Sequence, residues 1–131
     1  MGFKVGFNLM QVSESEPNDL IMLSKEAAKY PIDVLYFADS LGCMIPNQIN
    51  ELVNIFKNNT NLPIGIHAHN NMQLAMSNTI TSLMNGVTLL DATLLGMGRG
   101  AGNLKTELLL TQISKTQKIN FNKLTCRFRL F

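Results

Sequence analysis

The chain has 131 residues, of which 46% are hydrophobic and 15% charged, and its formal net charge at pH 7 is +2. This composition is typical of a folded globular protein, and the length allows at most one domain. The last fourteen residues carry four basic and no acidic side chains, so without them the net charge is −2 and nucleic acid is not expected as a partner. No apolar run approaches the roughly 18 residues of a membrane-spanning helix, so no membrane contact is expected.

Two further features indicate a cytoplasmic protein. The start, Met1–Lys4, lacks the charged and then apolar layout of a secretory signal. The two cysteines, Cys43 and Cys126, are too few for a disulfide framework, which favours a reducing compartment.

The apolar pattern predicts strands and helices in strict alternation along the chain. The first strand alternates in polarity, and the second is nearly continuous in apolar residues, as in a strand buried on both faces of a parallel sheet. Proline occupies the first position of the first two predicted helices, where its missing N–H does no harm. The predicted strands are 3–9, 33–38, 63–69 and 87–95, and the predicted helices are 17–30, 46–58, 72–85 and 104–116.

A repeat of this kind predicts parallel βα units. Both a doubly wound sheet and a (β/α)8 TIM barrel satisfy the spacing, and a complete barrel needs about 250 residues, so this chain would be half of one. A nucleotide-binding half-domain is disfavoured because residues 9–12, after the first strand, contain no glycine for a phosphate loop.

The two histidines of the chain, His67 and His69, lie two residues apart at the end of the third predicted strand. Residues with this spacing point to the same face of a strand, so both imidazoles could bind one divalent metal ion. A pair of hydrogen-bonded interior histidines explains the spacing equally well.

Polar residues also follow the other predicted strands. Asp39 and Ser40 end the second strand, where a barrel carries its catalytic groups, although a turn or capping role for Asp39 is the simpler alternative. Asp91 and Thr93 share a face of the last strand, so Asp91 could orient a metal ligand or be a buried structural carboxylate. Cys43 has no base next to it, which favours an unreactive thiol over a nucleophile.

The glycine-rich turn 96–103 follows the last strand and precedes a helix. Its glycine spacing does not match a dinucleotide fingerprint, and a flexible loop whose N–H groups hold an anion is the simpler interpretation. Asn103 would then be the N-cap of the helix.

Three segments, in this order, resemble the family of metal-dependent aldolase and acyl-transferase barrels that holds 4-hydroxy-2-oxovalerate aldolase, hydroxymethylglutaryl-CoA lyase and isopropylmalate synthase. The resemblance covers roughly residues 3–113. The segments are Asp39-Ser40-Leu41-Gly42 with Met44-Ile45-Pro46, then Gly65-Ile66-His67-Ala68-His69-Asn70-Asn71, and then Gly96-Met97-Gly98-Arg99-Gly100-Ala101-Gly102-Asn103.

This resemblance implies a partial (β/α)8 TIM barrel over residues 1–116, formed by about four parallel βα units of its C-terminal half. It implies a divalent metal, Mn²⁺ or Mg²⁺, bound by His67, His69 and Asn103. Ser40 stands where the hydroxy-oxovalerate aldolases bind pyruvate through a serine. The implied sites are completed by Gly98, Arg99 and Gly100 around the substrate and by Asp39, Asn70 and Asp91 behind the metal ligands.

The implied function is that of the C-terminal half of an aldolase that cleaves or forms 4-hydroxy-2-oxo acids from pyruvate and an aldehyde. The family's Arg-Asp pair on its first strand is absent from this sequence, so the chain alone is expected to be inactive. The unpaired edges of half a barrel are expected to make it self-associate as a homo-oligomer. The alternatives are a Claisen-type acyltransferase and a truncated gene product without activity. An aldehyde dehydrogenase partner is implied by the family alone, and residues 117–131 are expected to be a basic tail of unknown structure.

Overall fold

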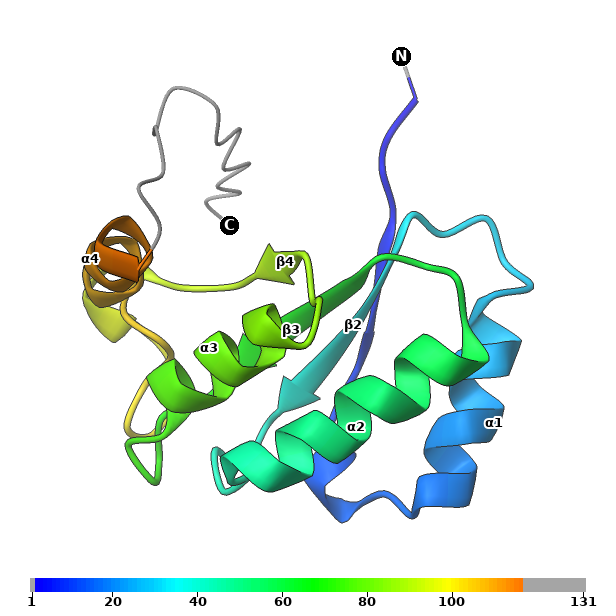
Figure 1. Cartoon of the computed structure of the whole chain (residues 1–131), viewed down its shortest axis with the longest axis horizontal. Coiled ribbons are helices and arrows are strands. Elements are labelled where there is room, and N and C mark those ends of the chain that lie inside the picture. The colour runs from blue at the N-terminus through cyan, green and yellow to red at the C-terminus, as the bar shows by residue number, and fades with distance from the viewer. Residues whose placement is uncertain (1, 117–131) are drawn as a thin grey trace.

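The computed structural model of the chain describes residues 2–116, which form one parallel sheet and its connecting helices (Figure 1). The strands are β1 (Gly6–Leu9), β2 (Val34–Asp39), β3 (Ile64–Ala68) and β4 (Leu89–Leu90). The helices are α1 (Pro17–Ala27), α2 (Pro46–Asn59), α3 (Ala75–Met84) and α4 (Thr106–Thr116), with short 3-10 helices η1 (Val12–Glu14) and η2 (Leu94–Gly96). The predicted tail, 117–131, lies outside the described residues.

The four strands are parallel and lie in the sequential order β1-β2-β3-β4. A doubly wound sheet would reverse its strand order at a switch point, whereas a barrel does not. The predicted partial (β/α)8 barrel is therefore confirmed as the fold class.

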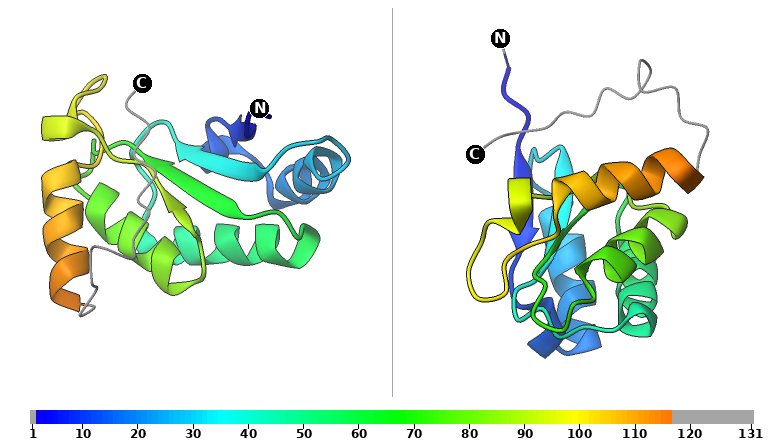
Figure 2. Two further views of the ribbon diagram at one scale, coloured as in Figure 1. Left: turned by 90° about the horizontal axis from the view of Figure 1, so that it is seen from above. Right: turned by 90° about the vertical axis from the view of Figure 1, so that its left-hand side faces the viewer.

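One face of the sheet is covered by a layer containing α1, α2 and α3 (Figure 2). Leu35 and Phe37 of β2 are fully buried beneath this layer, and the Phe37 ring lies 5.8 Å from that of Phe56 on α2. Phe56 belongs to the buried stripe of α2 with Ile49, Leu52 and Val53, which is the helical spacing that predicted this element. Burial of this stripe positions the strands and hence the loops at their carboxyl ends.

No helix within residues 2–116 covers the opposite face of the sheet (Figure 2). Tyr36 of β2 pairs in register with Gly65 of β3, and Ala38 pairs with His67. A side chain at position 65 would overlap the Tyr36 ring, so glycine makes room for an aromatic ring lying across this face. His67 is on the same open face, two residues further along β3.

Most of the predicted elements are shorter in the structure than in the sequence interpretation, and the reason is clear for β4 and α3. The last strand, β4, contains only Leu89–Leu90. The Asp91 N–H still donates to Ile66 O on β3, but beyond Asp91 the chain leaves the sheet. Thr93 instead pairs with Lys105, so it does not share a strand face with Asp91. Helix α3 begins at Ala75 rather than at residue 72, because Gln73 adopts a left-handed conformation.

Candidate active site at the carboxyl ends of the strands

The two histidines lie together at the carboxyl end of β3. Their ring centroids are 5.2 Å apart and their planes are inclined at 77°, so the rings meet edge to face on one side of the strand. His69 is buried, with 8% of its surface exposed, and His67 is half-buried. The structure thus brings the two predicted ligands together, and it does so from one strand.

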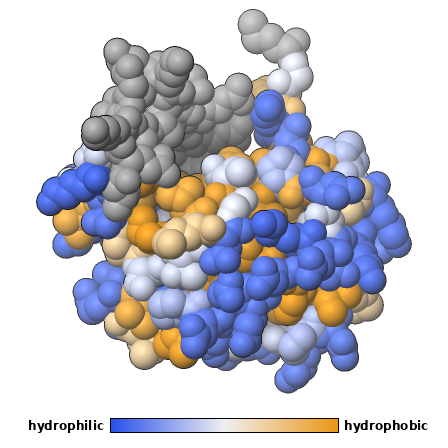
Figure 3. All heavy atoms as spheres, in the orientation of Figure 1, coloured by the Kyte–Doolittle hydropathy of each residue, from blue (hydrophilic) through white to orange (hydrophobic). Residues whose placement is uncertain are grey.

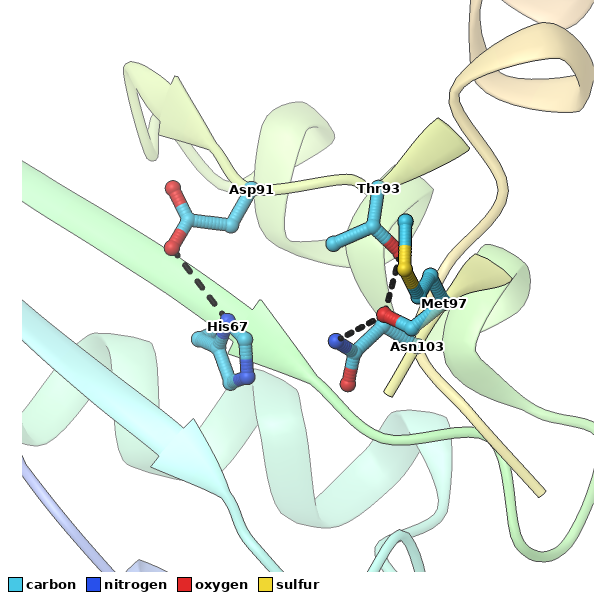
Figure 4. Close-up of polar contacts among 5 residues, drawn as sticks. All are labelled: His67, Asp91, Thr93, Met97 and Asn103. Atoms are coloured by element: carbon cyan, nitrogen blue, oxygen red, sulfur yellow. Dashed lines mark hydrogen bonds and ion pairs between the residues drawn. The ribbon is translucent and has the colours of Figure 1, made fainter. Parts of the chain in front are cut away.

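Asp91, directly after β4, holds the His67 ring in one orientation. His67 Nδ1 lies 3.3 Å from Asp91 Oδ2, and the second ring nitrogen lies on the far side of the ring (Figure 4). A carboxylate on Nδ1 favours the tautomer that carries its proton there, which leaves the Nε2 lone pair available to a metal.

Asn103, at the end of the glycine turn, is the third residue of this group. Its backbone forms an antiparallel bridge with His69, so the segment after the glycine turn runs directly beside the end of β3. Asn103 Nδ2 donates to the Met97 carbonyl at 3.0 Å, and the Thr93 hydroxyl donates to the same carbonyl at 2.8 Å (Figure 4). The amide is thereby oriented, and its Oδ1 is buried without a hydrogen-bond partner.

An N-cap role for Asn103 does not occur, because α4 begins at Thr106. A buried carbonyl oxygen without a partner is uncommon in folded proteins and calls for an explanation such as a missing ion or water. Imidazole nitrogens and an amide oxygen are neutral ligands that can bind a divalent metal ion. Within residues 2–116, no group of three or more His, Cys, Asp or Glu side chains is arranged so that it could hold a metal ion, so a metal held here would need further ligands.

Asp39 and Asn70 make contacts that differ from the expected position behind the metal ligands. The Asp39 carboxylate is fully buried and accepts the N–H groups of Cys43 and Met44 at 3.2 and 3.1 Å. This is the turn role considered above, and it fixes the loop between β2 and α2. Asn70 Oδ1 accepts the Ala75 N–H at 3.1 Å and so helps to begin α3. Cys43 remains an exposed free thiol.

A pocket of about 240 Å³ opens beside His69 and is lined by Ser40, Leu41, His69, Asn71, Arg99 and Gly100. Ser40 Oγ accepts the Gln11 N–H at 3.0 Å, which leaves the hydroxyl proton free to donate into the pocket. Gly98 does not line this pocket. A Cβ at Gly98 would lie 2.6 Å from Asn103 Nδ2, so this glycine makes room for the Asn103 side chain.

Leu41 and Asn71 are the pocket residues that the site prediction omits, and Asn71 makes the more informative contacts. Its Nδ2 donates to Leu41 O at 2.7 Å, and its Oδ1 accepts the Ala101 N–H at 3.2 Å. Through these two hydrogen bonds, the Asn71 side chain joins the loop after β2 to the glycine turn. The glycine turn is therefore held in place instead of being a flexible loop. Hydrophobic periodicity carries no signal for such a residue, since both partners are backbone groups distant in sequence.

The electrostatic environment favours the neutral form of His69. Burial lowers the pKa of His69 below its usual 6.5, and the nearby His67 and the positive charge of Arg99 lower it further. A neutral imidazole is the form that binds a metal ion.

The comparison with protein families assigns this chain to a known group. The family model described as HMGL-like matches residues 1–129. The chain belongs to the HMGL-like family. It is 40% identical over 111 residues to the 4-hydroxy-2-oxovalerate aldolase of Pelotomaculum thermopropionicum, a match that covers 85% of this chain and 32% of the relative. The enzyme of the same name from Geobacillus genomosp. 3 is 39% identical, over 85% of this chain and 33% of its own length.

Solved structures of HMGL-like proteins share the fold. The N-terminal domain of a proposed aldolase from Bacteroides vulgatus superimposes with a TM-score of 0.81 at 41% identity, over 92% of this chain and 41% of that one. The HMG-CoA lyase of Bacillus subtilis has a TM-score of 0.80 at 22% identity, over 86% of this chain and 42% of its own, which is a likeness of fold alone. The chain spans about a third of the length of the curated relatives it matches. In the described part, no helix is long and apolar enough to cross a membrane.

Proposed function

We propose that this chain forms part of a divalent-metal-dependent aldolase that cleaves or forms 4-hydroxy-2-oxo acids. The observation that carries the proposal is the buried, unpartnered Asn103 Oδ1 beside the paired rings of His67 and His69. These three residues would hold Mn²⁺ or Mg²⁺, with the remaining ligands supplied by other parts of a longer protein, by the substrate or by water.

The metal, when bound, would supply a Lewis acid for the oxygen atoms of the 2-oxo acid. The chain's own residues bind and orient the substrate around it. The Ser40 hydroxyl donates to a substrate oxygen, because its proton is not used in the hydrogen bond that its oxygen accepts from the Gln11 N–H. Asp91 holds the His67 ring in place, and Asn71 joins the two loops that form the sides of the pocket.

The proposed cleavage has a simple balance of atoms. A general base removes the proton of the 4-hydroxyl group, the C4–O bond becomes the carbonyl of the released aldehyde, and the C3–C4 bond breaks. The electron pair of that bond stays on the three-carbon fragment as the pyruvate enolate, which takes a proton at C3 to give pyruvate. The base is not assigned to any described residue.

The choice of an aldolase over a Claisen-type acyltransferase is supported by the relatives named 4-hydroxy-2-oxovalerate aldolase. A serine at position 40, rather than a threonine, favours the same choice. A homo-oligomer in the cytoplasm is a further proposal. An association with an aldehyde dehydrogenase is another, and it rests on the family alone.

Metal binding to the chain is the first test. Isothermal titration calorimetry with Mn²⁺ is expected to show one site in the wild-type chain and none in His67→Ala or His69→Ala. Asn54→Ala, on the exposed side of α2, is the control and should bind like the wild type. Equal Mn²⁺ binding by the wild type and both histidine variants would refute the proposed site.

The reaction itself is tested on a longer protein that contains this chain. Pyruvate release from a 4-hydroxy-2-oxo acid, dependent on added Mn²⁺ or Mg²⁺ and lost in His67→Ala, is the expected result. Metal-dependent consumption of acetyl-CoA with a 2-oxo acid, without pyruvate release, would assign the acyltransferase instead.

A further inference from the structure

The pocket beside His69 has a buried floor and an exposed rim. Ser40 and His69 form the floor, with 9% and 8% of their surfaces exposed. Arg99 and Gly100 lie on the exposed rim. A substrate that reaches the floor with its 2-oxo acid end would therefore meet Arg99 with its other end.

The Arg99 guanidinium has no acidic partner among residues 2–116. The ion pairs of this part of the chain are Lys29 with Glu26 and His67 with Asp91. Arg99 nevertheless lines the same pocket as the buried Ser40 and His69. An unpaired cation beside a partly polar pocket is suited to an anionic ligand.

The backbone that carries Arg99 is held by hydrogen bonds of the glycine turn that follows it. Arg99 O accepts the Gly102 N–H at 2.9 Å, and Gly102 O accepts the Asn70 N–H at 2.9 Å. Gly100 adopts a left-handed conformation with φ of 59°, and Ala101 is bound to Asn71 Oδ1. The arginine is therefore presented at the pocket from a turn of defined geometry.

We propose that Arg99 selects aldehydes that carry an anionic group, a carboxylate or a phosphate, by binding this group at the rim of the pocket. A guanidinium matches both anions, because its planar N–H groups can donate to two of their oxygen atoms at once. The inference rests on the proposed function, since the 2-oxo acid must occupy the floor. It narrows the second substrate from any aldehyde to an acidic one.

The test compares ligands that differ only in the distal anion. 2-Oxoadipate and 2-oxohexanoate share the 2-oxo acid end, differ by a terminal carboxylate and lack the 4-hydroxyl group needed for cleavage. 2-Oxo-3-deoxy-6-phosphogluconate and 2-oxo-3-deoxygluconate differ by a terminal phosphate and form the second pair; both carry a 4-hydroxyl group, so release of pyruvate is measured alongside their binding. Calorimetry on the Mn²⁺-loaded chain is expected to show about 10-fold tighter binding of the matching anionic ligand, the size of one charge-assisted contact. The pair with the larger ratio identifies the anion.

Substitutions test whether Arg99 causes the preference for the anionic ligand. Arg99→Gln is expected to reduce the ratio of the affinities for the anionic and the neutral-ended ligand to about 1, and to leave the affinity for the neutral-ended ligand unchanged. Arg99→Lys should keep part of the ratio, because it keeps the charge but not the planar donors. Lys105→Gln removes an exposed cation that does not line the pocket, and it should keep the full ratio.

The outcomes separate this inference from the function on which it rests. A wild-type ratio of 1 for both pairs, with measurable binding of all four ligands, overturns the inference and leaves the proposed function standing. An equal loss of affinity for both members of a pair in Arg99→Gln shows that Arg99 binds the shared 2-oxo acid end, which also overturns it. Failure of every ligand to bind the wild type refutes the proposed function, and the inference falls with it.

Discussion

Asn103 is held in a single orientation by its hydrogen bond to Met97, and this makes its substitution informative. In Asn103→Asp the donor to Met97 O is lost and a buried carboxylate is created, so the metal-free chain should unfold more easily by about 1–3 kcal/mol. The same carboxylate is a better ligand, so added Mn²⁺ should raise the Tm of this variant by more than that of the wild type.

Thermal unfolding followed by circular dichroism, with and without Mn²⁺, measures both effects. Asn54→Asp, on exposed α2 surface, should change neither. A Tm of Asn103→Asp that does not respond to Mn²⁺ would remove Asn103 from the ligand set.

Asp91 acts on the proposed metal only through the His67 ring, so its substitution should weaken binding without abolishing it. An amide in Asp91→Asn can still accept from Nδ1–H, but it no longer contributes a negative charge. Loss of such supporting groups typically costs about 10–100-fold in metal affinity. Calorimetry with Mn²⁺ should find a value in this range.

The matched control for Asp91 is Asp33, whose carboxylate accepts the Val5 N–H at 2.7 Å near the other edge of the sheet. Asp33→Asn should leave Mn²⁺ affinity unchanged even if it lowers the Tm. A similar loss of affinity in both variants would mean that Asp91 has only a structural role.

Among the elements, those with strong periodicity could be predicted closely and those shaped by loop contacts could not. The predicted and observed bounds of β2 and α2 agree within one residue, because their apolar residues are buried by the helix layer. β4 is much shorter than predicted, because Leu94 and Leu95 enter the 3-10 helix η2 instead of the sheet. The apolar side chains of Leu94 and Leu95 are typical of a strand. The pairing of Thr93 with Lys105, which the sequence pattern does not reveal, takes this segment out of the sheet.

Gly42 is the glycine on which the arrangement of two loops depends. It has a φ of 59°, and a Cβ at this position would lie 2.7 Å from Asn71 N and 2.9 Å from His69 O. Gly42→Ala should therefore lower the free energy of unfolding by more than about 1 kcal/mol, since strain and overlap act together. Urea denaturation measures the change, and Gly2→Ala, with no atom within 4 Å, is the control. Equal midpoints for the two variants would contradict this account.

Helix α4 is linked to η2 by a contact that depends on pH. Glu107 Oε1 accepts the N–H of Leu95 at 2.9 Å, and this bond lowers the pKa of Glu107 below its usual 4.5. Because the folded-state pKa is the lower one, the contribution to stability is present above about pH 4.5 and is lost as the pH falls through the folded-state value. Leu95 has a left-handed φ of 57°, so this turn should loosen in acid.

An NMR titration of the Leu95 amide follows this contact directly. Its chemical shift should change with an apparent pKa below 4.5 in the wild type and stay constant in Glu107→Gln. A titration of the Leu95 amide that persists in the variant would assign the change to another group.

On the scale of the whole molecule, the sequence predicts the kind of sheet but not the contacts that assemble the site. Alternation of strands and helices indicates four parallel units, and the histidine spacing indicates a shared face. The links between loops depend instead on Asn71, Asn103 and backbone groups up to 30 residues away. Asparagine is common in this chain, so composition alone could not separate these two from the others.

The edges of the sheet expose apolar surface. At the β1 edge, Phe7 is 46% exposed and contributes, with Leu23, Ala27, Tyr30 and Ile32, to an apolar hollow of about 310 Å³. On the β4 side of the helix-covered face, hydrophobic side chains gather beside the hydrophilic surface of α2 (Figure 3). Unpaired strand edges of this kind favour association with another chain.

The last prediction is that the 131-residue chain, tested alone, self-associates and does not turn over a 4-hydroxy-2-oxo acid. The proposed ligands His67, His69 and Asn103 are all neutral, so this ligand set contains no carboxylate that binds a divalent metal directly. Arg99 is the one cation that lines the described pocket, and it lies on the rim rather than beside the developing enolate. Absence of one preorganised charge typically costs about 10²–10³ in rate. Light scattering after size-exclusion chromatography and a pyruvate-release assay with Mn²⁺ test both parts, with a full-length relative as the positive control. A monomer whose metal-stimulated activity approaches that of the relative would show that the missing carboxylate and cation are not needed.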